Sequence, residues 1–133
     1  MTFGLTAGNY QIASGDLPDS PVFSDFGDNS NLFFSHNIHD PQQTWVFTPT
    51  DNEREISIQN LSGGYIVCGD KPGSLCFPGD YEEIYKVKQV SDNGYDLVSK
   101  KTGYSLSADG QDLKLAEYTS GNSEEAFILA PTD

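Results

Sequence analysis

The segment Gln42-Gln43-Thr44-Trp45-Val46-Phe47 carries the pattern that decides the fold. Two aromatic residues, with one residue between them, come shortly after a pair of glutamines. A similar pattern recurs 40 residues later and again after a further 42, as Glu82-Glu83-Ile84-Tyr85-Lys86-Val87 and Glu124-Glu125-Ala126-Phe127-Ile128-Leu129. A period of about 20–50 residues is typical of a chain built from repeated structural units.

Further short apolar runs fill the space between these segments. Their apolar residues alternate, as they do in strands with one buried face, and Gly, Pro, Asn and Asp separate the runs. Runs in matching places of the three repeats are Tyr10 and Ile12, Ile56 and Ile58, and Tyr95 and Leu97; then Val22, Tyr65-Ile66-Val67, and Tyr104 and Leu106; then Leu32 and Phe34, Leu75 and Phe77, and Leu113 and Leu115. No stretch of eleven residues keeps the 3.6-residue period of a helix.

Four strands in each of three repeats make twelve, and this number predicts an all-β fold of the β-trefoil type. In that fold six strands close a barrel and six form hairpins that cap one end, so that few sheet edges stay open. The 133 residues suit a single domain over 1–133, with repeats at roughly 8–50, 51–91 and 92–133. Trp45, Tyr85 and Phe127 are expected to anchor the core, because they recur with the repeat.

The charge balance excludes several classes of partner. Twenty acidic residues against seven basic ones give a formal net charge of −13. Such a chain repels phosphate backbones and anionic lipids, so we expect neither nucleic acid nor membrane insertion. The seven basic residues are scattered along the sequence, and we expect no basic patch of the kind that heparin-binding trefoils need. No apolar run approaches the roughly 18 residues of a membrane span, and no signal peptide precedes the first repeat, which predicts a soluble, cytoplasmic protein.

Two cysteines, Cys68 and Cys76, leave two interpretations open. A reducing cytosol favours free thiols, and a chain of this length closes a core without disulfides. Alternatively, a bridge would close the nine-residue segment 68–76 and hold a loop rigid.

Catalytic and metal-binding motifs find little support. His36 and His39 are the two histidines, and residues three apart on a strand face opposite sides. No Ser or Cys near them lies in a nucleophile motif. The oxygen-rich segment 25–31 lacks the glycine and closing glutamate of an EF-hand, and a hydrated turn explains it. We therefore expect no enzymatic activity, no cofactor and no metal.

Several motifs together resemble a known family. The first repeat has Gly27-Asp28-Asn29, Leu32-Phe33-Phe34-Ser35-His36-Asn37 and Gln42-Gln43-Thr44-Trp45; the second has Ser62-Gly63-Gly64-Tyr65-Ile66 and Gly73-Ser74-Leu75-Cys76-Phe77; the third has Leu113-Lys114-Leu115 and Gly121-Asn122. These resemble the Gly-Asp-Asn turn, the aromatic third strand and the Gln-x-Trp ending of the ricin-B-type β-trefoil lectins, especially the small fungal ones. In the third repeat Glu125 and Phe127 stand where Gln and Trp are usual.

The resemblance implies a non-catalytic lectin that binds galactose-type sugars, with glycans or glycoproteins as partners and a homodimer left open. Sugar binding needs a carboxylate that accepts hydrogen bonds from hydroxyls, an aromatic platform and an amide. The first repeat supplies these groups, with Phe34 or Phe33 as the platform. The expected carbohydrate-binding residues are Asp25, Asp28, Asn29, Phe34, His36, Asn37 and Gln43. Asp25 takes the place of an aspartate that the family has nearer Phe23.

The other two repeats offer less. The second has Asp70 and Phe77 without a following amide, and the third has Ala116 where a platform is expected. We therefore expect one sugar site, in the first repeat.

An alternative function comes from fungal protease inhibitors of the mycocypin and cospin kind, which share the fold. They act through exposed loops that enter a serine or cysteine protease in extended conformation. The candidate loops are 14–21, 48–54 and 68–76, in which Arg54 and Lys71 could enter an acidic pocket, and the glycines of 62–64 could enter a papain-like cleft. Pro, Gly, Asp and Asn are also what ordinary hairpin turns contain.

Overall fold

The computed structural model describes residues 7–14, 22–24, 31–50, 54–90, 94–118 and 126–132. Within these ranges the chain forms twelve β-strands and one short 3-10 turn, η1 (Pro41–Gln43), and no α-helix. The strands are β1 (Gly8–Ser14), β2 (Val22–Ser24), β3 (Phe33–Ser35), β4 (Trp45–Pro49), β5 (Glu55–Asn60), β6 (Tyr65–Cys68), β7 (Cys76–Gly79), β8 (Ile84–Gln89), β9 (Tyr95–Ser99), β10 (Ser105–Asp109), β11 (Asp112–Ala116) and β12 (Ala126–Thr132).

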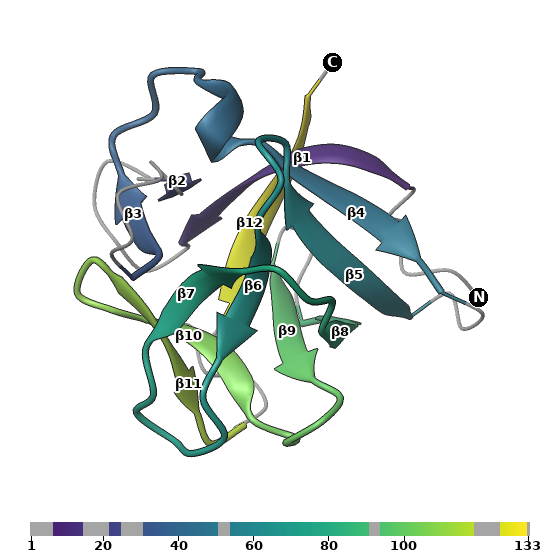
Figure 1. The fold of residues 1–133 in the computed structure, drawn as a ribbon, viewed down its shortest axis with the longest axis vertical. Helices are drawn as coiled ribbons and strands as arrows, with labels where there is room; N and C mark the ends of the chain where they lie inside the picture. Colours follow the sequence, from purple (N-terminus) through teal and green to yellow (C-terminus); the bar gives the residue numbers. More distant parts are fainter. Residues whose placement is uncertain are drawn as a thin grey trace.

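Six of the strands close a barrel, as Figure 1 shows. Strand β1 pairs with β4, β4 with β5, β5 with β8, β8 with β9, β9 with β12, and β12 returns to β1, all antiparallel. The pairing of β1 with β12 runs from Asn9 opposite Thr132 to Ser14 opposite Phe127. Because every barrel strand has two neighbours, none presents an open edge.

The other six strands form three hairpins, β2–β3, β6–β7 and β10–β11. The hairpins join one another at one end of the barrel. The Leu32 amide donates to the Cys76 carbonyl (2.7 Å), the Leu113 amide donates to the Leu32 carbonyl (3.2 Å), and the Leu115 amide donates to the Ser74 carbonyl (2.9 Å). Barrel and capping hairpins, four strands from each repeat, confirm the β-trefoil prediction.

The core lies inside the barrel and beneath the hairpins. Trp45, Tyr85 and Phe127 are at most 1% exposed, and the alternating residues of the barrel strands join them. Full burial of side chains this large contributes on the order of 2–3 kcal/mol each. The prediction that these three residues anchor the core is therefore confirmed.

Two of the three anchors also tie the barrel to its hairpins. The indole N–H of Trp45 donates to the Phe23 carbonyl on β2 (2.9 Å), and the Tyr85 hydroxyl donates to the Ile66 carbonyl on β6 (3.1 Å). Burial raises the pKa of Tyr85 far above its usual value and so keeps the phenol protonated as a donor. Phe23 and Ile66 thus occupy equivalent positions. Phenylalanine, the third anchor, has no polar group for such a bond.

Cys68 and Cys76 form a disulfide. The prediction of free thiols, which the sequence favoured, is therefore wrong. The two residues lie directly opposite each other in the β6–β7 ladder, with Cα atoms 4.1 Å apart. Sequence spacing alone does not reveal this register, since it depends on where the hairpin turns. The bridge closes the base of an exposed loop, residues 69–73.

We predict that the double variant Cys68→Ala, Cys76→Ala unfolds more easily than the natural chain, by about 2–3 kcal/mol, because the closed nine-residue loop no longer restricts the unfolded state. Urea denaturation with and without dithiothreitol measures the difference. Reductant should destabilise the natural chain and leave the double variant unchanged. If dithiothreitol left the denaturation midpoint of the natural chain unchanged, the result would contradict a stabilising disulfide.

Candidate functional site

The residues that the sequence predicts as a sugar site divide into three groups. Asp25, Asp28 and Asn29 lie outside the described residues. Phe34 and Gln43 lie in the interior, and His36 and Asn37 lie in the loop after β3. The structure therefore brings Gln43, His36 and Asn37 together in the loop 36–43, whereas Phe34 packs in the core.

Gln43 is fully buried and holds the loop 36–43 from inside. Its Nε2 donates to the Ser24 hydroxyl (3.2 Å) and to the His36 carbonyl (2.8 Å), and its Oε1 accepts from the Ile38 amide (3.0 Å). With each polar atom bonded inside the protein, Gln43 has no side-chain surface for a ligand. The expectation that Gln43 contacts a sugar is corrected, and its role is to position the loop.

Phe34 is also interior, with no exposed surface. Its ring centroid lies 5.5 Å from that of Phe23 and 6.0 Å from that of Phe127. A ring packed in this way has no free face for a pyranose, so the platform role predicted for Phe34 is wrong. The neighbouring Phe33 points to the other side of the strand and is half-buried.

Asn37 forms a reciprocal amide pair with Gln11 on β1. Gln11 Nε2 donates to Asn37 Oδ1 (2.9 Å), and Asn37 Nδ2 donates to Gln11 Oε1 (3.0 Å). Asn37 Oδ1 also accepts from the amide of His39, whose φ of 57° turns the chain at that point. Asn37 thereby fixes the loop to the barrel, while the side chains of His36 and His39 are exposed.

The equivalence of Phe23 and Ile66 shows which residues of the other repeats match Phe33. Phe23 lies opposite Phe34, and Ile66 lies opposite Pro78, so Phe34 and Pro78 are equivalent. The residues before them, Phe33 and Phe77, therefore both face outward. Phe77 is 43% exposed. Phe77 belongs to the aromatic motif of the second repeat, but only the register separates an outward ring from a core ring.

The second repeat replaces the buried glutamine with an acid. Glu83 stands two residues before Tyr85, as Gln43 stands before Trp45, and Val67 takes the place of Ser24. Valine cannot accept the bond that Gln43 donates, and a carboxylate has no N–H to donate. Glu83 is accordingly half-buried and directed to the surface. Burial raises the pKa of Glu83 above the usual 4.5, against the opposing effect of the Lys101 charge.

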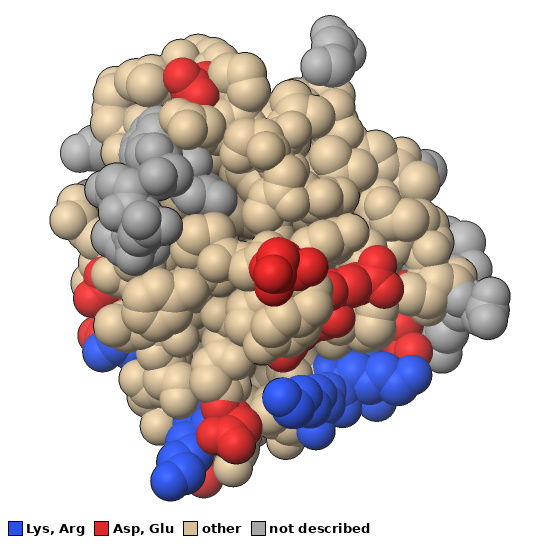
Figure 2. Space-filling view, viewed as in Figure 1, with Lys and Arg blue, Asp and Glu red and all other residues tan. Residues whose placement is uncertain are grey.

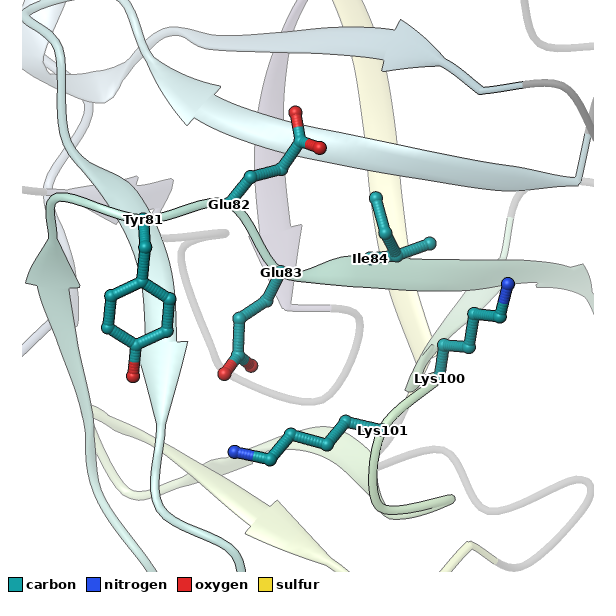
Figure 3. A pocket seen from close by; sticks show the side chains of 6 residues that line it. All are labelled: Tyr81, Glu82, Glu83, Ile84, Lys100 and Lys101. Carbon is teal, nitrogen blue, oxygen red and sulfur yellow. The ribbon is translucent and has the colours of Figure 1, made fainter.

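A surface hollow of about 360 Å³ lies beside Glu83, between the second and third repeats. Tyr81, Glu82, Glu83, Ile84, Lys100 and Lys101 line it. Figure 3 shows the Glu83 carboxylate beside the Tyr81 ring and the end of the Lys101 side chain below that carboxylate. Tyr81 is 52% exposed. Sequence reasoning missed this site, because Lys100 and Lys101 reach it only through the pairing of β8 with β9.

The basic residues are not scattered, which corrects the sequence-based expectation. Five of the seven, Arg54, Lys86, Lys88, Lys100 and Lys101, are exposed on the wall formed by β5, β8 and β9. Figure 2 shows the largest group of Lys and Arg at the lower right, beside acidic residues, and smaller groups at the lower left. Lys100 Nζ lies 2.8 Å from Glu55 Oε1. The wall carries mixed charge.

Two of the segments proposed for protease inhibition, 68–76 and 62–64, contain or adjoin tight turns. The Ser74 amide donates to the Lys71 carbonyl (3.1 Å), so Lys71 begins a β-turn. The Gly63 amide donates to the Asn60 carbonyl (2.8 Å), which makes 60–63 a turn as well. An inhibitory loop enters a protease in extended form. These two loops therefore do not support the alternative function, which stays a prediction for 14–21 and 48–54.

Among the described residues, no three His, Cys, Asp or Glu side chains come close enough together to hold a metal ion. The same part of the chain contains no helix long and apolar enough to cross a membrane.

We predict that Gln43→Ala lowers the free energy of unfolding by about 2–3 kcal/mol, because the Ile38 amide and the His36 carbonyl lose their buried partner. Gln42→Ala is the matched control, since Gln42 bonds through its backbone, and it should change stability little. Chemical denaturation measures both variants. Normal stability with lost ligand binding in Gln43→Ala would instead identify Gln43 as a ligand contact.

We predict that Glu83→Gln stabilises the protein at pH 7, because it removes a charge whose burial is unfavourable. A carboxyl whose pKa is raised on folding stabilises fully below its unfolded pKa, and that stability is lost as the pH rises through the folded pKa. The melting temperature of Glu83→Gln should exceed that of the natural chain at pH 7, and the gap should close below pH 4.5. Thermal melts across this range measure it; a gap independent of pH would contradict the assignment.

Comparison with known proteins identifies the fold. No family model and no curated protein matches the sequence. The structure is similar to the Rhizoctonia solani agglutinin, with a TM-score of 0.82 and 12% identity over 99% of this chain and 100% of that one. It is also similar to the Macrolepiota procera ricin B-like lectin in complex with lactose (TM-score 0.79, 15% identity, 96% and 99% covered). A designed threefold-symmetric protein, ThreeFoil, matches with a TM-score of 0.80 and 15% identity over 94% of this chain and 99% of that one. The chain is therefore a β-trefoil protein, with the fold of the fungal ricin B-like lectins.

Proposed function

We propose that this chain is a carbohydrate-binding protein that recognises a galactose-type sugar through its first repeat and does not catalyse a reaction. The observation that carries the proposal is the loop 36–43, which Gln43 and Asn37 hold in one conformation from beneath and beside it. A preformed loop binds a ligand without the entropic cost of ordering it. Glycans or glycoproteins are the natural partners of such a site.

The chemistry of the first repeat suits a pyranose. His36 exposes an imidazole, Phe33 presents a half-buried ring, and Asp25 and Asp28 are carboxylates in the adjoining sequence. Hydroxyls donate to carboxylates, and the apolar face of the sugar packs on an aromatic ring. The Macrolepiota lectin, which has this fold, is described in complex with lactose, and this supports a galactoside as the first ligand to test.

We expect the double variant Asp25→Ala, Asp28→Ala to lose lactose binding and to keep its melting temperature, because carboxylates in a polar stretch of sequence contribute little to stability. Isothermal titration calorimetry with lactose and a glycan array measure binding. The matched control is Asp80→Ala, Glu117→Ala, which removes the same charge from exposed positions outside the first repeat and should bind normally. Unchanged binding in the first variant would exclude these carboxylates, and a natural chain that binds no glycan would refute the proposal.

A further inference from the structure

The hollow between Tyr81 and Lys101 has a defined shape. Its two sides are the segment 81–84, which leads into β8, and the turn after β9. The Lys100 amide donates to the Ile84 carbonyl (2.9 Å) and joins the two sides. The turn itself is closed by bonds from the Gly103 amide to the Ser99 carbonyl (2.8 Å) and from the Ser99 amide to the Tyr104 carbonyl (2.7 Å). The backbone around the hollow is therefore held by hydrogen bonds on both sides.

The groups that line the hollow are those that bind sugar rings. Tyr81 exposes an aromatic ring, Ile84 adds apolar surface, Glu83 offers a carboxyl and Lys101 an ammonium group. A pyranose can pack its apolar face on the ring while one hydroxyl donates to Glu83 and a neighbouring one accepts from Lys101. The volume, about 360 Å³, lies at the small end of ligand pockets, which measure about 300–1,000 Å³.

The charges select a neutral ligand over an acidic one. Lys100 is already paired with Glu55, so the cation left for a ligand is Lys101. Glu82 and Glu83 lie at the same hollow, and the whole chain carries a net charge of −13. A carboxylate or sulfate on the ligand would be repelled by Glu82 and Glu83 and would compete with Glu83 for the Lys101 ammonium group. A hydroxyl-rich, uncharged ring meets no such repulsion.

We infer that the hollow lined by Tyr81, Glu83 and Lys101 is a second carbohydrate site, which takes a single neutral sugar residue. The ligand class of this inference, a sugar, rests on the proposed function. The location of the site does not, because none of these residues belongs to the first repeat. Glu83 reaches this site because Val67 leaves it no interior partner. Sugar binding at two places on the rim would allow one chain to hold two glycans.

The test is a titration of the ¹⁵N-labelled chain with neutral methyl glycosides of galactose, glucose, mannose and N-acetylglucosamine, followed by NMR. We expect at least one glycoside to shift the amide signals of Tyr81, Ile84 and Lys101, in the natural chain and equally in Asp25→Ala, Asp28→Ala. Tyr81→Ala and Lys101→Ala should each weaken this binding about tenfold, the effect of losing one stacking or charged contact. Ile128→Ala and Lys71→Ala, which change exposed side chains of similar kind elsewhere, are the controls and should bind normally.

The outcomes separate the two proposals. A glycoside that shifts only signals of the first repeat refutes the second site and leaves the proposed function standing. Shifts at Tyr81 and Lys101 without any at the first repeat support the second site and refute the first. If methyl glucuronide binds at the hollow better than every neutral glycoside, the inferred ligand class is wrong. If no glycoside shifts any signal at millimolar concentration, both proposals fail.

Discussion

The pairing of β1 with β12 is the constraint on which the rest of the structure depends. It joins the first and last described strands through six residue pairs, and without it the other five pairings of the barrel would leave an open sheet with two edges. Closure fixes the barrel radius and leaves one end to be covered by the hairpins. Each hairpin must then reach the barrel wall, and the bonds from Trp45 and Tyr85 to hairpin carbonyls make that connection.

The three repeats use different residues to connect their hairpins to the barrel wall. The first uses an indole N–H, the second a phenol hydroxyl, and the third a phenylalanine. The second also has the disulfide, which links the two strands of its hairpin. The bonds from Trp45 and Tyr85 to their hairpins each stay within one repeat, whereas the bonds that join the three hairpins run between repeats.

The sequence predicts the fold better than the site, for a physical reason. Strand alternation and the recurrence at Trp45, Tyr85 and Phe127 report burial, which a two-residue period encodes directly. The assignment of Phe34 as a platform failed because Phe33 and Phe34 are adjacent aromatic residues, and only the pairing of Phe23 with Phe34 decides which faces inward. The disulfide and the hollow depend in the same way on register between strands that are distant in sequence. Such register follows from turn positions, which composition does not specify.

Changes in the interior also determine what the surface presents. Val67, which is half-buried, stands where the buried Ser24 accepts a bond in the first repeat, and its side chain lies so near Gly79 that a Cβ there would overlap it. Glycine at position 79, which pairs with Tyr65, leaves room for the Val67 side chain, and the buried glutamine has no counterpart in the second repeat. Its replacement, Glu83, lies half-exposed beside Tyr81. The first two repeats therefore differ at this position and in the polar residue that precedes the barrel anchor, Gln43 in one and Glu83 in the other, although both form the same four strands.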